Sequence, residues 1–336
     1  MIITQKFNSA FDIDSEFIPV LDELLSSCVP KFELIQSYEK NAPENIHFAY
    51  YLFFGNKTNA PIGFAQLHIE NKLESKPSFL NRFFKKKSVE ESDSTIEWKI
   101  PGSLGEGIIF DPMYIKHATE KTESIFNEYL ARKDVKIQNI VFSEAYLGFN
   151  KFRESMPNST NHLISVGHFR KKVNSYQSYL ESLGSDQHQS IKNEWKSIQK
   201  ILQYQMGEFP NFKEIFQYKS EGRIQYKELK DLFPIKKYIN STIETTYLTL
   251  ESKERVHLII AFTNGVGHNA FYEVLYIDDT IPENIIHQLA FIKFFEMPDL
   301  DKLHILLNTF NYNHLISLGF TDVKQTKVSI TKKINA

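Results

Sequence analysis

Three glycines in the segment GSLGEG have a spacing that could bind phosphate. They are Gly102, Gly105 and Gly107. Because glycine has no side chain, backbone N–H groups in such a segment can approach an anion closely. The alternative is a glycine-rich turn entering a strand, because IIFDP follows and leaves no room for a helix before Pro112. A lone glycine motif is a weak signal, so the turn is favoured.

A row of lysines at every fourth position could also contact an anion. Lys192, Lys196 and Lys200 would share one face of a helix, where they could bind phosphate or an RNA acceptor stem. The opposite face carries the apolar residues Ile191, Trp195, Ile198 and Leu202. This pattern is typical of an amphipathic helix with a solvated charged face, which is the favoured interpretation. The basic run from Arg82 to Lys87 is interpreted in the same way.

Histidine and cysteine give little support for a metal centre or a nucleophile. The 11 histidines are scattered, without HxH or HExxH spacing, so we expect no metal site. Cys28 is the only cysteine, which makes an internal disulfide impossible and fits a reducing compartment. It falls on the apolar face of a predicted helix, where packing is its favoured role. The sequence contains no GxSxG, Walker or kinase motif.

The composition is that of an ordinary globular protein and excludes few partners. Of the 336 residues, 42% are hydrophobic and 24% are charged, which allows two domains with cores of their own. The net charge of -2 gives no electrostatic argument for nucleic acid. No apolar stretch is long enough to predict a membrane span, and the N-terminus lacks the pattern of a signal peptide. We expect a cytoplasmic protein.

The first part of the chain is predicted to alternate helices with strands. Apolar residues at helical spacing predict a helix at 15–28, and two apolar runs on either side of GNKTNAP predict a hairpin at 47–70. Further strands are expected at 95–100, 135–149 and 159–173, and a helix at 118–133. A largely helical segment, 175–205, then leads into the second part.

The second part repeats this order of elements without repeating the residues. Strands at 255–263 and 270–279 flank NGVGHN, whose composition is typical of a hairpin turn. Helices are expected at 228–243, 282–297 and 311–319, the last ended by Gly319, and strands at 302–308 and 323–330. We therefore predict mixed α/β or α+β layers, with an N-terminal domain at 1–175, a linker helix at 176–210 and a C-terminal domain at 211–336.

The segment NTFNYNHLISLGF, together with the linker, carries a resemblance to a known superfamily. Asn308 at a strand end, the helix from Tyr312 to Ser317 and the run Leu318, Gly319 and Phe320 resemble the closing part of a GNAT acyltransferase domain. The segment SYQSYLESLGSDQHQSIKNEWKSIQK looks like the linker helix of Fem-type aminoacyltransferases, in which two GNAT-like domains are fused. The resemblance covers roughly residues 10–335.

This resemblance implies two GNAT-like domains in tandem and a transferase activity. The reaction would move an acyl or aminoacyl group from a CoA thioester, or from an ester, to a small-molecule or peptide amine. Glu273 and Tyr276 would border the acceptor site, with Glu97 in the matching place of the first half, and a carboxylate there could accept a proton from the attacking amine. The alternative for these carboxylates is the solvent side of a half-buried strand. Acyl-CoA would contact the glycine segment Gly102–Gly107 and Asn308.

Several residues depart from the superfamily pattern and keep other functions open. The expected cofactor loop of the second half is replaced by IDDTIPEN, which has no glycine, and Asp278, Asp279 and Glu283 would repel a pyrophosphate. Leu315 stands where a tyrosine is common, and Gln187 with His188 stands where the linker is usually basic. A non-catalytic binding or scaffold protein is therefore the second hypothesis. An enzyme that uses aminoacyl-tRNA, suggested by the lysine row, is the third.

Overall fold

The structure is a computed structural model with two mixed sheets. It describes residues 2–56, 59–71, 94–98, 100, 107–114, 121–122, 124–125, 127–129, 131, 135–143, 159–165, 168–200, 202–207, 237–238, 241–253, 256–278, 280–306, 312–321 and 324–331. No helix among them is long and apolar enough to cross a membrane. The predicted fold class, a mixed α+β protein with two sheets, is confirmed. Arg82 to Lys87 lies outside the described residues.

The first sheet has the strand order β1-β2-β3-β4-β6-β14-β7, and β5 pairs with β3 beside this path. Its strands are β1 (Ile2–Phe7), β2 (Ile46–Gly55), β3 (Pro61–Asn71), β4 (Ser94–Trp98), β5 (Ile108–Phe110), β6 (Val135–Ser143), β7 (Ser159–Ser165) and β14 (Lys324–Thr331). The predicted hairpin corresponds to β2 and β3, which pair antiparallel. β4 and β6 run parallel.

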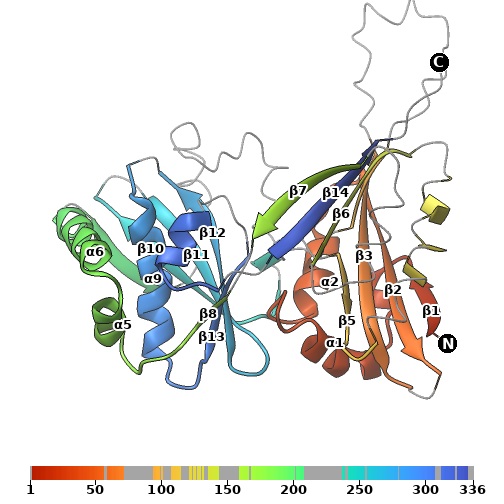
Figure 1. The fold of residues 1–336 in the computed structure, drawn as a ribbon, viewed down its shortest axis with the longest axis horizontal. Coiled ribbons are helices and arrows are strands. Elements are labelled where there is room, and N and C mark those ends of the chain that lie inside the picture. Colours follow the sequence, from red (N-terminus) through yellow and green to blue (C-terminus); the bar gives the residue numbers. More distant parts are fainter. Residues whose placement is uncertain are drawn as a thin grey trace, which may run out of the picture.

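Helices α1 (Ile18–Leu24) and α2 (Glu33–Lys40) pack on one face of the first sheet, after short 3-10 turns at Ala10–Asp12 and Ser15–Phe17. Leu21 of α1 and Ile35 of α2 are buried in one apolar cluster with Tyr50 and Phe64 from the strands. The predicted first helix at 15–28 therefore forms as a turn followed by α1. Figure 1 shows α1 and α2 below and beside the strands of this half.

The second sheet has the order β8-β13-β12-β11-β10-β9, and helices cover one of its faces. Its strands are β8 (His168–Arg170), β9 (Gln203–Gly207), β10 (Thr245–Glu251), β11 (Val256–Asn264), β12 (Asn269–Ile277) and β13 (Lys302–Ile305). The helices are α5 (Tyr176–Ser182), α6 (Ser185–Ile198), α9 (Glu283–Glu296) and α10 (Tyr312–Ser317). Phe291 and Phe294 of α9 and Ile191 of α6 are buried in this core.

Local sequence signals correctly predicted a turn and a helix end in the second half of the chain. The loop NGVGHN connects β11 to β12, and Gly267 and His268 both have positive φ there, as such a turn requires. Gly319 follows α10 with φ +90, and Phe320 N donates to Leu315 O across it, so the predicted helix end is confirmed.

Two strands lie in the sheet of the opposite half of the sequence. β14, from the end of the chain, inserts between β6 and β7 of the first sheet and pairs antiparallel with both (Figure 1). β8, which follows β7 directly in sequence, pairs with β13 of the second sheet. The chain therefore crosses between the sheets more than once. The proposed domain boundaries at 1–175 and 211–336 divide the sequence, whereas the hydrogen bonds of these two strands cross that division.

We predict that removing β14 destabilises the first sheet more than the second. A chain ending at Thr321 leaves β6 and β7 without the strand that lies between them. We expect faster amide hydrogen exchange in β6 and β7, with β10 to β12 changed little. A chain ending at Thr331 keeps β14 and is the matched control. Equal loss of protection in both sheets would show that the halves unfold as one unit.

Candidate functional site

In the second sheet, β12 continues past the end of its parallel neighbour β13. The two strands run parallel and share register from Asn269 with Lys302 to Tyr272 with Ile305. A last backbone bond joins Leu306 N to Tyr272 O at 2.9 Å. β13 ends there, but β12 continues from Glu273 to Ile277. Glu273 is therefore the first residue of β12 beyond the segment that pairs with β13.

A β-bulge lies in the part of β12 that extends past β13. Ile260 of β11 is opposite Val274, whereas Ile259 is opposite Tyr276, so Leu275 is the extra residue. Side chains on a regular strand alternate between faces, which would place Glu273 and Tyr276 on opposite sides. Because of the bulge, Tyr276 lies on the same face as Leu275 and Glu273. The two predicted catalytic residues thus lie on one face of the sheet.

Glu273 is fully buried in a polar network on this face. Its Oε2 atom lies 2.7 Å from Lys237 Nζ and accepts a hydrogen bond of 2.5 Å from the Tyr238 hydroxyl. Oε1 has no hydrogen-bond partner among the described residues. Lys237 and Glu273 are 2% and 0% exposed, so the interpretation of Glu273 as a surface carboxylate is wrong. Because Lys237 and Tyr238 both contact Oε2, the Oε1 atom of Glu273 is left for another group.

The first half of the chain contacts this network through α2. Ser37 Oγ donates a hydrogen bond of 2.7 Å to the backbone oxygen of Lys237. Glu33 Oε1 accepts from both the backbone N–H and the hydroxyl of Thr242, at 2.6 and 2.5 Å. Leu34, also on α2, is buried among apolar residues of the second sheet, including Leu275 and Tyr276. The face of β12 that carries Glu273 is thus covered by the other half.

Tyr38 connects the two predicted carboxylates electrostatically. Burial raises the pKa of the Tyr38 hydroxyl, and the charges of Glu97 and Glu273 raise it further. Both carboxylates therefore lie near one phenol, although they come from β4 and β12. Glu97 is only half-buried and lies opposite His68 of β3 and Asn139 of β6. The Tyr38 ring lies 6.4 Å from the ring of His68, the residue opposite Glu97, and a shared site for Glu97 and Glu273 stays a prediction.

The predicted cofactor residues are only partly described. Gly107 is buried and its carbonyl accepts a hydrogen bond of 3.0 Å from Gln66 N, next to β5. Its role in binding acyl-CoA stays a prediction. Gly102, Gly105 and Asn308 lie outside the described residues. Before the start of α9, Asp278 Oδ2 lies 3.2 Å from His257 Nδ1, and Asp278 Oδ1 accepts a hydrogen bond from Thr280 N.

The linker lysines point to solvent, as the amphipathic pattern indicates. Lys192, Lys196 and Lys200 are exposed, whereas Ile191 and Ile198 are buried against the second sheet. Contact of these lysines with a nucleic acid stays a prediction.

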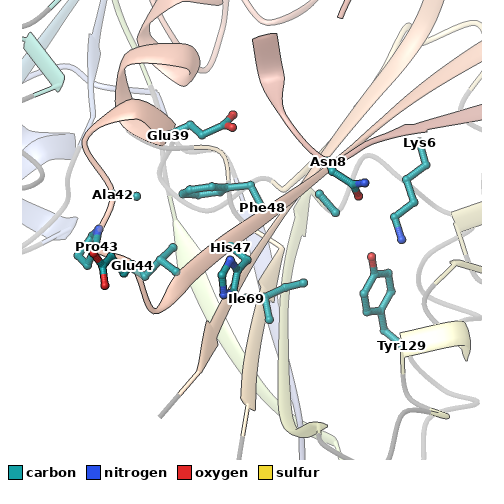
Figure 2. Close-up of a pocket in the computed structure, with 12 residues that line it drawn as sticks. Lys6, Asn8, Glu39, Ala42, Pro43, Glu44, His47, Phe48, Ile69 and Tyr129 are labelled. Atoms are coloured by element: carbon teal, nitrogen blue, oxygen red, sulfur yellow. The ribbon is translucent and has the colours of Figure 1, made fainter. Parts of the chain in front are cut away.

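The first half contains a pocket that the sequence did not indicate. Its volume is about 680 Å³, and it lies between β1, β2 and the region after α2 (Figure 2). Lys6, Glu39, His47 and Tyr129 give it polar groups, and Phe48 gives it an aromatic wall. None of the predicted catalytic residues lines it. These residues are far apart in sequence and share no motif, so only the folded chain could identify them.

Comparisons with known proteins support the fold. No family model matches the chain, and no curated protein is significantly similar to it in sequence. Over its whole length the structure is similar to a tandem GNAT protein from the clavulanic acid biosynthesis pathway, solved without acetyl-CoA. The TM-score is 0.55, the sequence identity is 8%, and 100% of each chain is covered. At this identity the likeness shows the fold alone, and the predicted resemblance to tandem GNAT proteins is confirmed at that level.

Two further solved structures align over most of the chain with TM-scores below 0.5. A GCN5-related N-acetyltransferase from Sphaerobacter thermophilus has a TM-score of 0.48 and 7% identity, covering 100% of this chain and 98% of its own. The C-terminal DUF2156 domain of a putative lysylphosphatidylglycerol synthetase from Agrobacterium fabrum has 0.44 and 6%, covering 94% and 91%. At these scores neither supports an argument about function.

We predict that Lys237 and Glu273 depend on each other for stability. Lys237→Met leaves a buried carboxylate without its cation and should lower the free energy of unfolding by about 3–5 kcal/mol. The double variant Lys237→Met/Glu273→Leu removes both charges and should recover most of that loss. Urea denaturation of the parent, both single variants and the double variant measures this coupling. Additive losses would contradict a direct interaction.

We predict that the folded protein loses stability in acid because His304 is buried. It lies on β13, and burial lowers its pKa to about 3 from an ordinary value near 6.5. The unfolded chain therefore binds a proton at this residue between about pH 6.5 and 3 that the folded chain does not. Stability is fully present above that window and falls as the pH decreases, by up to about 1.4 kcal/mol per pH unit. His304→Gln should reduce the slope by one proton in urea titrations, while His188→Gln should not.

Proposed function

We propose that this protein is an N-acyltransferase that moves an acyl group from a thioester, an acyl-CoA, to an amine. The observation that carries the proposal is that β12 continues past the end of β13, with a bulge at Leu275 and a buried carboxylate at the first residue beyond β13. In a GNAT-like fold, the acyl donor is received between two such strands as an added strand-like group. The tandem GNAT fold of the whole chain supports the same class of reaction.

The chemistry asked of this chain is mainly positioning and proton transfer. An amine attacks the thioester carbonyl, a C–N bond forms, the C–S bond breaks, and the sulfur leaves as a thiolate that takes up a proton. We assign to Glu273 Oε1 the acceptance of the proton lost by the amine. Lys237 and Tyr238 hold the other oxygen and fix the orientation of the carboxylate. Tyr276 lies on the same face and would contact the acceptor.

The start of α9 does not fit a pyrophosphate as the chain stands. Helix N-termini usually attract anions through their N–H groups, but here Pro282 is the N-cap and Glu283 follows it. A carboxylate at that end repels a second anion. We assign the acyl end of a donor to the part of β12 beyond β13, and its phosphates would need another contact. The glycine segment 102–107 is the sequence candidate for that contact.

A non-catalytic binding protein is the second candidate, and a specific observation favours it. The charge of Glu273 is already neutralised by Lys237, and Tyr238 and α2 close the face on which it lies. A purely structural role, which is to hold the two halves together, also accounts for such a network. An enzyme that uses aminoacyl-tRNA is the third candidate, and the exposed lysines of α6 are its only support.

The decisive experiment combines donor binding with turnover. We expect acetyl-CoA or longer acyl-CoAs to raise the melting temperature of the full chain and to release free CoA when mixed with an amine panel. The double variant Lys237→Met/Glu273→Leu should keep its fold but lose about 10²–10⁴-fold in kcat/KM. Glu181→Gln, an exposed carboxylate on α5, is the control.

The other outcomes assign the remaining candidates. Stabilisation that disappears in Gly105→Asp places the donor site in the first half. A double variant with full activity contradicts the role of Glu273. No stabilisation by any thioester favours the binding protein. Binding of tRNA that is lost with salt and in Lys192→Glu/Lys196→Glu favours the tRNA-dependent enzyme.

A further inference from the structure

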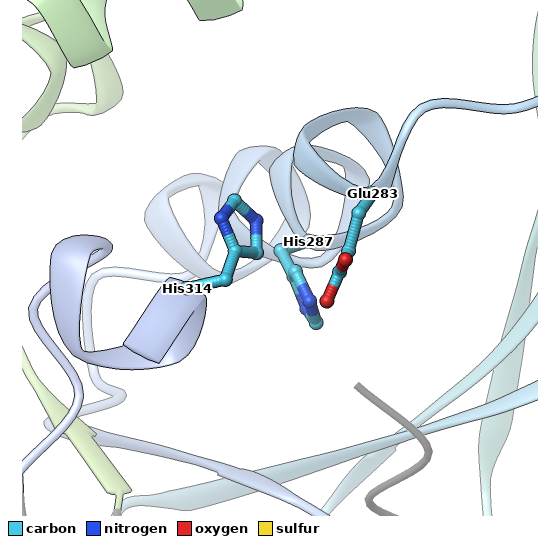
Figure 3. Close-up of side chains that lie close together, drawn as sticks. All are labelled: Glu283, His287 and His314. Carbon is cyan, nitrogen blue, oxygen red and sulfur yellow. The ribbon is translucent and has the colours of Figure 1, made fainter. Parts of the chain in front are cut away.

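Two helices of the second half bring three potential metal ligands together. α9 places Glu283 and His287 one turn apart, and α10 contributes His314 from the other side. One ligand atom from each residue lies within 4.8 Å of the others. Figure 3 shows Glu283 and His287 side by side on α9, with His314 reaching toward them from its own short helix. The imidazole rings of His287 and His314 are 5.6 Å apart between centroids.

We propose that Glu283, His287 and His314 bind a divalent transition-metal ion of the zinc class. Two imidazole nitrogens and one carboxylate oxygen form a ligand set that Zn²⁺ accepts and that the oxygen-preferring ions Ca²⁺ and Mg²⁺ do not favour. Bonds of about 2.0–2.1 Å to zinc place neighbouring ligand atoms about 3.3 Å apart in a tetrahedron. The three residues therefore need only small side-chain rotations to converge on one ion.

His287 has the second interaction that metal-binding histidines commonly have. Its Nδ1 atom lies 2.7 Å from the hydroxyl of Tyr272 on β12, so the opposite nitrogen, Nε2, is the one suited to a metal. The hydroxyl oxygen of Tyr272 can accept the Nδ1 proton, which leaves Nε2 with a lone pair for the ion. A neutral imidazole is the form that binds metal.

A second carboxylate stands beside the cluster on α6. Glu194 Oε1 is held by Asn284 Nδ2 and Ser190 Oγ at 2.8 and 3.0 Å. Its Oε2 atom is buried and has no hydrogen-bond partner among the described residues. The Nε2 atom of His314 is likewise buried and has no hydrogen-bond partner among the described residues. Asn284, which holds Glu194, follows Glu283 directly in α9, so Glu194 reaches α9 next to the cluster.

Charge supports a dication at this place. A helix N-terminus on its own disfavours a cation, because the first N–H groups carry partial positive charge. Glu283 and Glu194 together supply two negative charges, which match those of the ion. Glu194 can approach the fourth coordination position directly or through a water molecule, since three protein ligands leave one position open in a tetrahedron. The ion would join α9 to α10, the helices that precede and follow β13 in the sequence.

The test uses the full chain, stripped of metal with a chelator and then mixed with Zn²⁺. After gel filtration we expect one zinc per chain by elemental mass spectrometry, together with a higher melting temperature. His314→Ala should weaken zinc binding at least 100-fold, and Glu283→Gln at least tenfold. Tyr272→Phe keeps the shape of the core but removes the hydroxyl, and should weaken binding about 10–100-fold. His188→Ala, a histidine of α6 outside the cluster, should bind zinc like the parent.

The metal-free proteins separate loss of a ligand from loss of the fold. His314→Ala without zinc should melt close to the metal-free parent, because the ligand is only half-buried. Cobalt(II) gives a second readout, since its visible spectrum reports the coordination and should change in each ligand variant. No bound zinc in the parent, or unchanged zinc binding in both His314→Ala and Glu283→Gln, would overturn the proposal. In that case the three side chains lie together without an ion.

Discussion

The hydrogen bonds of β14 are the constraint on which the two-sheet arrangement depends. This strand closes the chain, yet it lies between β6 and β7 of the first sheet and pairs with both. In the sequence, β14 follows every strand of the second sheet. The first sheet therefore reaches its final strand order only when β14 has paired with β6 and β7. Pairings between such distant parts of a chain form late, because the loop between them must be closed first. The two halves are thus linked by topology as well as by contacts.

This linkage keeps one face of β12 in contact with the first half. Ser37 and Glu33 of α2 form hydrogen bonds with Lys237 and Thr242 of the second half. Leu34 is buried in one apolar cluster with Leu275. Burial of Glu273 is tolerable only because Lys237 neutralises it, since an isolated carboxylate in an apolar interior is very unfavourable. A site built from Glu273 consequently belongs to the interface of the halves. The nearness of Tyr38 to Glu97 and Glu273 fits this arrangement.

Local signals in the sequence predicted elements well and their partners poorly. The hairpin at NGVGHN, the helix end at Gly319 and the exposed lysine face of α6 depend on residues close in sequence, and all three were predicted. The insertion of β14 and the bulge at Leu275 depend on which strands become neighbours, and no residue pattern encodes that. Lys237 was missed because its partner is on a distant strand. His314 was missed because metal motifs with short spacing cannot detect a ligand contributed by the next helix.

The charge at the start of α9 connects the two proposals about this protein. Without a cation, Glu283 makes this end of the helix negative, and the phosphates of a CoA donor are repelled from the place where a GNAT-like fold would hold them. A zinc ion held beside Glu283 and Glu194 would balance the two negative charges of these carboxylates. The helix end would then no longer repel a phosphate. On these two proposals, the metal content of this cluster, as well as the missing glycine loop, bears on whether the second half can hold an anionic donor.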